Sequence, residues 1–245
     1  METFEAQVES LTGITISSSG TIPTQAQLTQ FLNDGVIDVT NRTLQDRDKI
    51  DDDVYEPFQR ETSTSDSQGV SVGGAKIIAV LREADSDGSS DGTKAWYPCS
   101  KIPVALQSRV IDTESLNFAS IYNPVYTVDN DKTINVYPVP SSNDGFKVYY
   151  VNEEPRDITN NASLTYAHSN IKYFPNDKVY LVVIYAAIKS LESKRAELVL
   201  VEEDSELVQA ISYNIQDLQN QYDKAFQATE KIALLTKAGV GAQWK

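Results

Sequence analysis

The sequence predicts an α+β fold, in which N-terminal and C-terminal helices form a helical bundle and carry an inserted antiparallel β-rich lobe. Two observations predict the helices. Apolar residues recur at spacings of three and four over residues 24–44, and a longer repeat with the same spacings begins at Val208. A third observation predicts the lobe, because residues 70–151 hold several turn signals and many tyrosines, which strands favour.

The length, cysteine content and charge of the chain exclude several classes of protein. The chain has 245 residues, a formal net charge of −14 and one cysteine, Cys99. A chain of this length can bury a hydrophobic core that is stable without disulfides or bound metals. Because a single cysteine cannot form an internal disulfide, the fold needs no oxidising compartment. The N-terminus is acidic and lacks an apolar segment, so we predict no signal peptide. The charge argues against nucleic-acid binding, because phosphate contacts require clustered lysine and arginine.

The N-terminal segment, residues 1–22, is predicted to be extended. It begins with apolar Phe4, and Ile14 and Ile16 then alternate with polar neighbours before a loop at 17–20.

A helix is predicted over residues 24–44. Thr24 and Gln27 match a capping box, in which each side chain accepts a hydrogen bond from the other's backbone N–H. Gly35 lies on the apolar face, where a glycine costs about 1 kcal/mol relative to alanine. Either close approach to a neighbouring helix or simple tolerance would explain it. The apolar residues of this face are Leu28, Phe31, Leu32, Val36 and Val39.

Residues 45–69 are polar and acidic, and we expect them to be mobile. Within this stretch, residues 54–58 are the candidate for a short edge strand. The strand-rich lobe then begins at Val70. Its predicted elements are a buried strand at 75–81, a polar loop at 85–93, a strand at 95–99, a short helix at 102–110, a hairpin of 124–128 with 133–139, and a strand at 146–151.

After a polar connection at 152–172, a buried helix is predicted over 176–196. The run 179–188 carries no charge, and its ten residues are too few to cross a bilayer, which takes about 20. Pro175 and Asp177 favour a helix start. The β-branched residues of the run leave a buried strand as the alternative.

A long helix is predicted over 203–237, followed by a flexible tail at 239–245. Its apolar residues repeat over more than three heptads, which is typical of a helix that packs along its whole length. The repeat packs either against the other helices of the chain or between copies of the chain. The candidate assembly residues are Val208, Ile211, Ile215, Leu218 and Tyr222 on the helix, and Val240, Gln243 and Trp244 in the tail.

The sequence lacks a phosphate-binding loop, a nucleophile elbow and a zinc-binding helix motif, so we predict a protein that is not an enzyme and that uses no cofactor or metal. The single histidine, His168, is predicted to lie on the surface, and Cys99 to be a buried thiol. Asp85 and Asp87 match the first ligands of a calcium loop, but Trp96 occupies the position of its closing glutamate, which favours a solvated loop. A carboxylate-based hydrolase is a minor alternative.

Several segments resemble structural proteins of marine tailed phages, and the layout is similar to the head–tail adaptor family, also called connector or head-completion proteins. These segments are Phe-Glu-Ala-Gln-Val-Glu-Ser-Leu-Thr at 4–12, Leu-Thr-Gln-Phe-Leu-Asn-Asp-Gly at 28–35, Leu-Asn-Phe-Ala-Ser at 116–120, Pro-Val-Tyr at 124–126, and residues 174–191. The resemblance covers about half the chain, by motifs that serve packing. Residues 45–69 and 85–93 depart from it.

The resemblance implies a virion protein of the neck that is assembled in the host cytoplasm, forms a dodecameric ring below the portal protein, and has no membrane partner. Its helical part would surround the channel through which DNA is ejected without specific binding, and an acidic ring would repel the phosphates. Its C-terminal segment would reach the portal or a downstream neck or tail protein. The alternative is another tail-completion, tail or baseplate protein.

The predicted organisation has four parts. An N-terminal segment, helix and polar loop occupy 1–69, the β-rich lobe 70–151, the C-terminal part of the helical bundle 152–238, and the tail 239–245.

Overall fold

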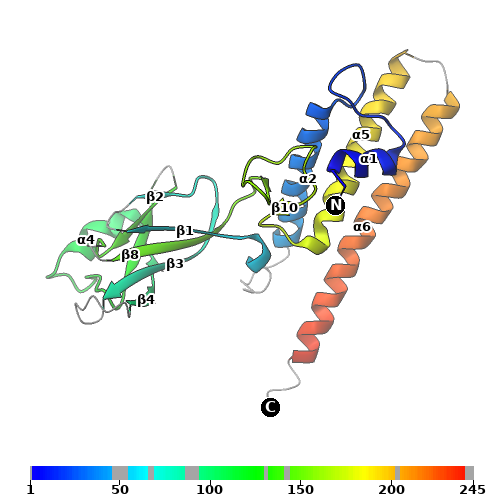
Figure 1. The fold of residues 1–245 in the computed structure, drawn as a ribbon. Coiled ribbons are helices and arrows are strands. Elements are labelled where there is room, and N and C mark those ends of the chain that lie inside the picture. Colours follow the sequence, from blue (N-terminus) through cyan, green and yellow to red (C-terminus); the bar gives the residue numbers. More distant parts are fainter. Residues whose placement is uncertain are drawn as a thin grey trace. The chain divides into compact units, whose positions relative to one another are not determined.

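The fold is of the α+β class, as predicted, and the chain divides into two compact units (Figure 1). The helical unit consists of residues 1–49 and 154–245, and the β-rich unit of residues 50–153. The computed structural model describes residues 2–45, 55–65, 69–85, 94–129, 132–140, 144–201 and 205–240, the last of these without the side chains of 227–240.

The helical unit begins with a helix, α1 (Phe4–Thr12), where we predicted extended chain. Thr3 caps this helix by accepting a hydrogen bond of 3.3 Å from the Ala6 N–H, and Gly13 ends it with a φ of 68°. Phe4 and Val8 are both fully buried. Their spacing of four residues places both on one helical face, so the extended prediction was wrong because it overlooked the helical period.

The helix α2 (Gln25–Gln45) confirms the second predicted element. Its capping box forms as expected, because the Thr24 N–H donates to Gln27 Oε1 at 2.8 Å and the Gln27 N–H to Thr24 Oγ1 at 3.3 Å. A Cβ atom added to Gly35 would lie 3.1 Å from Tyr185 Cδ1 and 3.3 Å from Val182 Cγ1. Close helix approach, and not simple tolerance, therefore explains this glycine.

Two long helices complete the helical unit. A short 3-10 turn, η3 (Asn176–Lys178), leads into α5 (Val179–Val201), and α6 (Ser205–Val240) follows. The uncharged run is therefore a helix and not a strand. α5 packs against α1, α2 and α6, which explains why it is apolar on most faces. Figure 1 shows α6 continuing past the first turn of α5.

The polar connection before α5 holds a small two-stranded ladder, β9 (Arg156–Asp157) with β10 (Ile171–Lys172). The loop between these strands binds the start of α1. The Phe4 N–H donates to the His168 carbonyl at 2.7 Å and the Glu5 N–H to the Tyr166 carbonyl at 3.1 Å. These bonds satisfy N–H groups that have no partner within the first turn of a helix.

The first sheet of the β-rich unit has the strand order β1-β8-β3-β4, with all neighbours antiparallel. Its strands are β1 (Gln59–Ser65), β8 (Gly145–Val151), β3 (Lys76–Asp85) and β4 (Lys94–Pro98). Three of them were predicted. β1 was not, because its polar sequence lies inside the stretch that we expected to be mobile. The predicted edge strand at 54–58 was wrong, since η1 (Glu56–Phe58) is a 3-10 helix.

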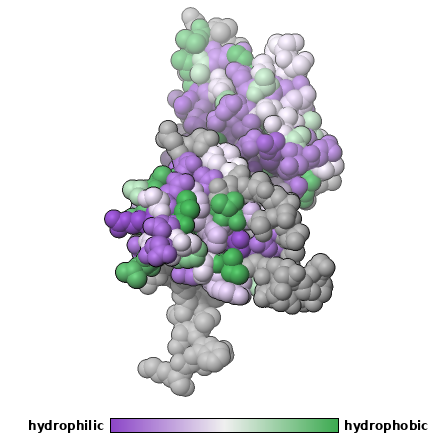
Figure 2. Space-filling view, turned by 90° about the vertical axis from the view of Figure 1, so that its left-hand side faces the viewer, coloured by the Kyte–Doolittle hydropathy of each residue, from purple (hydrophilic) through white to green (hydrophobic). Residues whose placement is uncertain are grey.

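The second sheet has the order β2-β7-β6-β5 and contains the predicted hairpin. β6 (Val125–Val128) pairs antiparallel with β7 (Thr133–Tyr137), and short strands flank them, β2 (Val70–Ser71) beside β7 and β5 (Ser100–Lys101) beside β6. The predicted short helix appears as η2 (Val104–Leu106) followed by α4 (Gln107–Ile111). Figure 2 shows a face of this unit on which hydrophobic residues lie among hydrophilic ones.

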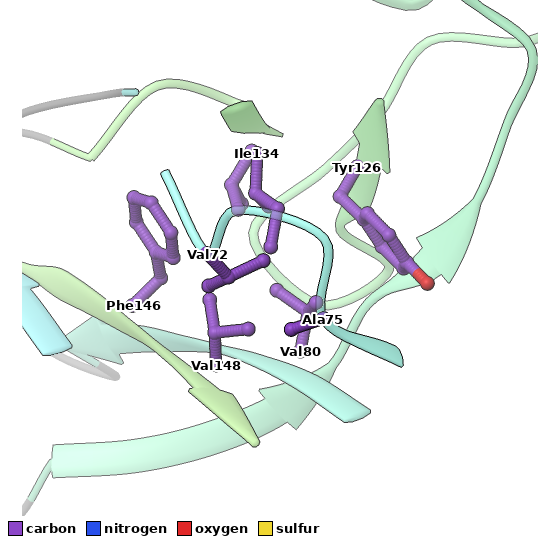
Figure 3. Close-up of a cluster of buried hydrophobic side chains, with 8 residues drawn as sticks. Val72, Ala75, Val80, Tyr126, Ile134, Phe146 and Val148 are labelled. Carbon is purple, nitrogen blue, oxygen red and sulfur yellow. The ribbon is translucent and has the colours of Figure 1, made fainter. Parts of the chain in front are cut away.

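The core of the β-rich unit is formed by side chains from both sheets (Figure 3). Phe146 and Val148 from β8 and Val80 from β3 meet residues of the second sheet. The buried cluster consists of Val72, Ala75, Val80, Tyr126, Ile134, Val136, Phe146 and Val148. Burial of this apolar surface holds the two sheets together.

Candidate assembly surfaces

The predicted seam of α6 packs against helices of the same chain. Ile215, Leu218 and Tyr222 are buried, whereas Val208 and Ile211 are half-buried. α6 lies on α5, so the helical repeat contributes to the core of the helical unit. A role for these residues between copies stays a prediction.

Tyr222 links the last helix to α2. Its hydroxyl donates a hydrogen bond of 2.6 Å to Asp38 Oδ2, and Arg42 Nε lies 2.9 Å from the same oxygen. The Arg42 guanidinium also stands 5.2 Å from the centroid of the Tyr222 ring. Burial, together with the hydrogen bond to Asp38, raises the pKa of Tyr222, so the phenol stays protonated and remains a donor.

The structure does not describe the side chains of the three predicted assembly residues in the tail. Val240 is the last residue of α6, and its side chain is not among those described. Gln243 and Trp244 lie outside the described residues. Their assembly role stays a prediction.

A pocket of about 430 Å³ lies between the segment after α1 and the helices α5 and α6. We call it the hairpin pocket. Because it combines residues from three separate stretches of chain, no local pattern predicts it, although one predicted residue, Ile211, lines it. Its apolar lining residues are Ile14, Ile22, Leu191, Leu198, Leu207 and Ile211.

The β-rich unit exposes large apolar side chains around α4 and in the loop that follows it. Leu116 is fully exposed, at 105% of its reference surface. We call these exposed residues the loop patch, consisting of Val104, Ile111, Leu116, Phe118 and Tyr122. Exposed apolar patches of this kind often mark interaction sites.

Histidine, cysteine and acidic residues are the candidates for a metal site. Among the residues that the structure describes, no cluster of histidine, cysteine and carboxylate side chains could hold a metal. Cys99 is half-buried against the core of the β-rich unit and not fully buried as predicted, and this burial raises the pKa of its thiol to about 12. The acidic stretch that resembles a calcium loop lies outside the described residues beyond Asp85.

His168 is half-buried in the polar connection before α5. Its Nδ1 accepts a hydrogen bond of 3.0 Å from the Thr165 N–H, and its Nε2 lies 3.9 Å from Asp157 Oδ2. The ring therefore helps to shape the loop that caps α1.

The two units together match one known family, since the family model of the SU10 adaptor protein covers residues 7–237. The chain belongs to the SU10 adaptor protein family. The match extends from α1 into the last turns of α6, so the β-rich unit is part of the adaptor and not a separate addition. It confirms the resemblance to phage head–tail adaptors and makes this adaptor a phage structural protein.

A search of curated proteins finds no match to this adaptor. None of its helices, within the part of the chain that the structure describes, is long and apolar enough to span a membrane.

Proposed function

We propose that this adaptor is a non-enzymatic protein of the virion neck, which forms a homo-oligomeric ring below the portal and joins the capsid to the tail. The observation that carries the proposal is the family match over residues 7–237, because it includes both compact units. By the resemblance to head–tail adaptors, the ring has twelve copies and a downstream neck or tail protein binds its other side.

The charge of the chain supports a channel through which DNA passes without being bound. The helical unit has 13 basic and 19 acidic residues, a net charge of −6, and the β-rich unit has 8 and 16, a net charge of −8. A wall that carries the same sign of charge as the phosphates repels them, whereas a basic wall would hold the DNA.

The mass of the purified protein, measured alone and after addition of its portal protein, tests the ring. We expect an assembly of portal and adaptor whose mass corresponds to a ring of adaptor copies. A monomer that remains a monomer in the presence of the portal would contradict the proposal. Labelled antibody on virions provides the location, and label away from the vertex between head and tail would also contradict it.

Deletion of residues 239–245 tests the proposed role of Val240, Gln243 and Trp244. We expect particles that package DNA but fail to retain their tails or their DNA. Particles of normal infectivity would refute the role of the tail while leaving the ring intact. Retention of DNA by the purified adaptor at physiological salt would contradict a channel without specific binding.

A further inference from the structure

His168, the single histidine of the chain, lies between two groups that suit different protonation states of its ring. On one side, its Nδ1 accepts a hydrogen bond of 3.0 Å from the Thr165 N–H. Only a ring nitrogen with a free lone pair accepts such a bond, so the neutral ring carries its proton on Nε2. On the other side, Nε2 lies 3.9 Å from Asp157 Oδ2, where a charged ring would form an ion pair.

The turn from Thr165 to His168 caps α1. The His168 N–H donates to the Thr165 carbonyl at 3.2 Å, so the backbone and the ring close the turn together. The carbonyls of Tyr166 and His168 then accept hydrogen bonds from the first turn of α1. From α2, the neutral Thr29 hydroxyl accepts a hydrogen bond of 3.2 Å from the Tyr166 N–H. The shape of this turn therefore determines whether the first N–H groups of α1 have partners.

Asp157 on β9 is the charged side chain that faces the ring. Although burial raises the pKa of this carboxyl, hydrogen bonds from backbone N–H groups lower it below 3.8, so Asp157 is ionised wherever histidine titrates. The charged residues beside it are engaged elsewhere. Arg156 pairs with Glu154, and Glu5 on α1 accepts a hydrogen bond of 2.7 Å from Gln25.

A proton added to the ring changes which of these bonds can form. It occupies Nδ1, so the Thr165 N–H loses its acceptor and two N–H groups oppose each other across 3.0 Å. The charged Nδ1 can donate to Thr165 Oγ1 at 3.1 Å, but this bond leaves the backbone N–H unpaired. The charge also attracts the ring toward Asp157. Movement of the ring toward Asp157 relieves the first contact and strengthens the second.

We propose that His168 is a pH-sensitive switch that controls the cap of α1. The neutral ring holds the turn at 165–168 closed, whereas the charged ring releases the Thr165 N–H and pairs with Asp157. The carbonyls that cap α1 then lose their fixed positions, so the first turn of α1 opens more often in mildly acidic solution. The inference does not depend on the proposed ring of copies, because all of these groups lie in the helical unit of one chain.

Amide hydrogen exchange of the full chain, followed by NMR at about pH 5.5 and about pH 7.5, tests the switch across the range in which histidine titrates. Each rate is divided into the rate of an unfolded amide at the same pH, and the resulting protection factor excludes the direct effect of pH on exchange. We expect the protection factors of Thr165, Phe4 and Glu5 to be roughly tenfold lower at the acidic pH. That of Leu32, which is fully buried in α2, should be unchanged.

His168→Asn is the matched control, because the asparagine oxygen can accept a hydrogen bond from the Thr165 N–H but does not titrate. We expect the protection of the same amides in this variant to be equal at the two pH values. Constant protection in the unaltered chain, or an equal fall in both proteins, would overturn the switch. A fall at Thr165 without one at Phe4 and Glu5 would also overturn it, since the cap of α1 would then be unaffected.

A second measurement needs no variant and therefore does not depend on whether His168→Asn folds. Because the chain has one histidine, its ring signals report the titration of His168 alone. We expect the Thr165 amide signal to shift with the same midpoint as the ring. A Thr165 signal that does not shift, or that shifts with a different midpoint, would overturn the switch.

Discussion

The Tyr222 hydroxyl on α6 donates a hydrogen bond of 2.6 Å to the Asp38 carboxylate on α2, across 184 residues of sequence. Arg42 binds the same carboxylate and lies over the same ring. The N-terminal and C-terminal parts of the chain are therefore joined by a specific polar contact as well as by apolar packing. Such a bond fixes the register of α6 against α2, since a shift by one turn would break it.

Tyr222→Phe should lower the free energy of unfolding of the helical unit by about 1–2 kcal/mol, because a hydrogen bond to a charged acceptor is lost while the ring remains. Urea denaturation followed by far-ultraviolet circular dichroism measures the change. Tyr213→Phe is the matched control, since Tyr213 is largely exposed on the same helix. Equal stabilities of the two variants would show that the bond to Asp38 contributes nothing.

The sequence predicts α2 and α6 correctly because the residues of each helix contain a pattern that is typical of helices. α2 has its capping box and apolar face, and α6 has its repeat. For Gly35 the sequence left close approach and simple tolerance open, and only the structure shows the close approach and identifies Val182 and Tyr185 as the neighbours.

The elements that sequence reasoning missed depend on partners far away in the chain, or on a helical period that was overlooked. β1 is polar and becomes a strand because it pairs with β8 along its whole length. α1 had the spacing of a helix, which the extended prediction overlooked. In the candidate site, the repeat predicted Tyr222, but its partner Asp38 and the hairpin pocket follow from tertiary packing that local patterns do not encode.

Arg82→Met should strongly destabilise the β-rich unit. Arg82 is 2% exposed, its Nε donates to the Pro138 carbonyl at 2.9 Å, and its Nη2 lies 3.3 Å from Asp144 Oδ2. Removal of one member of a buried ion pair leaves the other charge poorly compensated, at a cost of about 3 kcal/mol or more. Denaturation followed by tryptophan fluorescence reports the loss.

Arg109→Met is the control for this prediction, because Arg109 lies on the surface of the same unit. We expect a change of at most about 0.5 kcal/mol. Similar losses for the two variants would mean that the buried position of Arg82 has no energetic consequence.

Cys99 should resist alkylation in the folded protein. Burial raises the pKa of its thiol from 9.0 to about 12. At pH 8 the reactive thiolate is therefore about a thousandfold rarer than in the unfolded chain, and iodoacetamide should react more slowly by a similar factor. The rate in urea is the control, and equal rates would contradict the prediction. Because the folded pKa is the higher one, the stability contributed by the neutral thiol should fall as pH rises from about 9 toward 12.

Asp157 should make the helical unit sensitive to acid. Burial raises the pKa of this carboxyl. Three effects outweigh burial and lower the pKa below 3.8: a hydrogen bond of 3.0 Å from the Asn160 N–H, a hydrogen bond of 2.9 Å from the Thr159 N–H, and the nearby His168. The ionised form is therefore favoured in the folded state. The contribution of the ionised carboxylate to the free energy of unfolding is complete above about pH 4. This contribution is lost as the pH falls below 3.8 and passes through the pKa of the folded state.

Asp157→Asn isolates this effect from the other carboxyl groups, since both proteins share them. At pH 6 the variant should be less stable by about 1 kcal/mol, because an amide oxygen accepts the same N–H groups without the charge. Below pH 3 the difference between the two proteins should shrink, because the native carboxyl becomes protonated as well. Urea denaturation at both pH values measures it. A difference that stays constant from pH 6 to pH 2.5 would show that the charge of Asp157 does not hold the loop that caps α1.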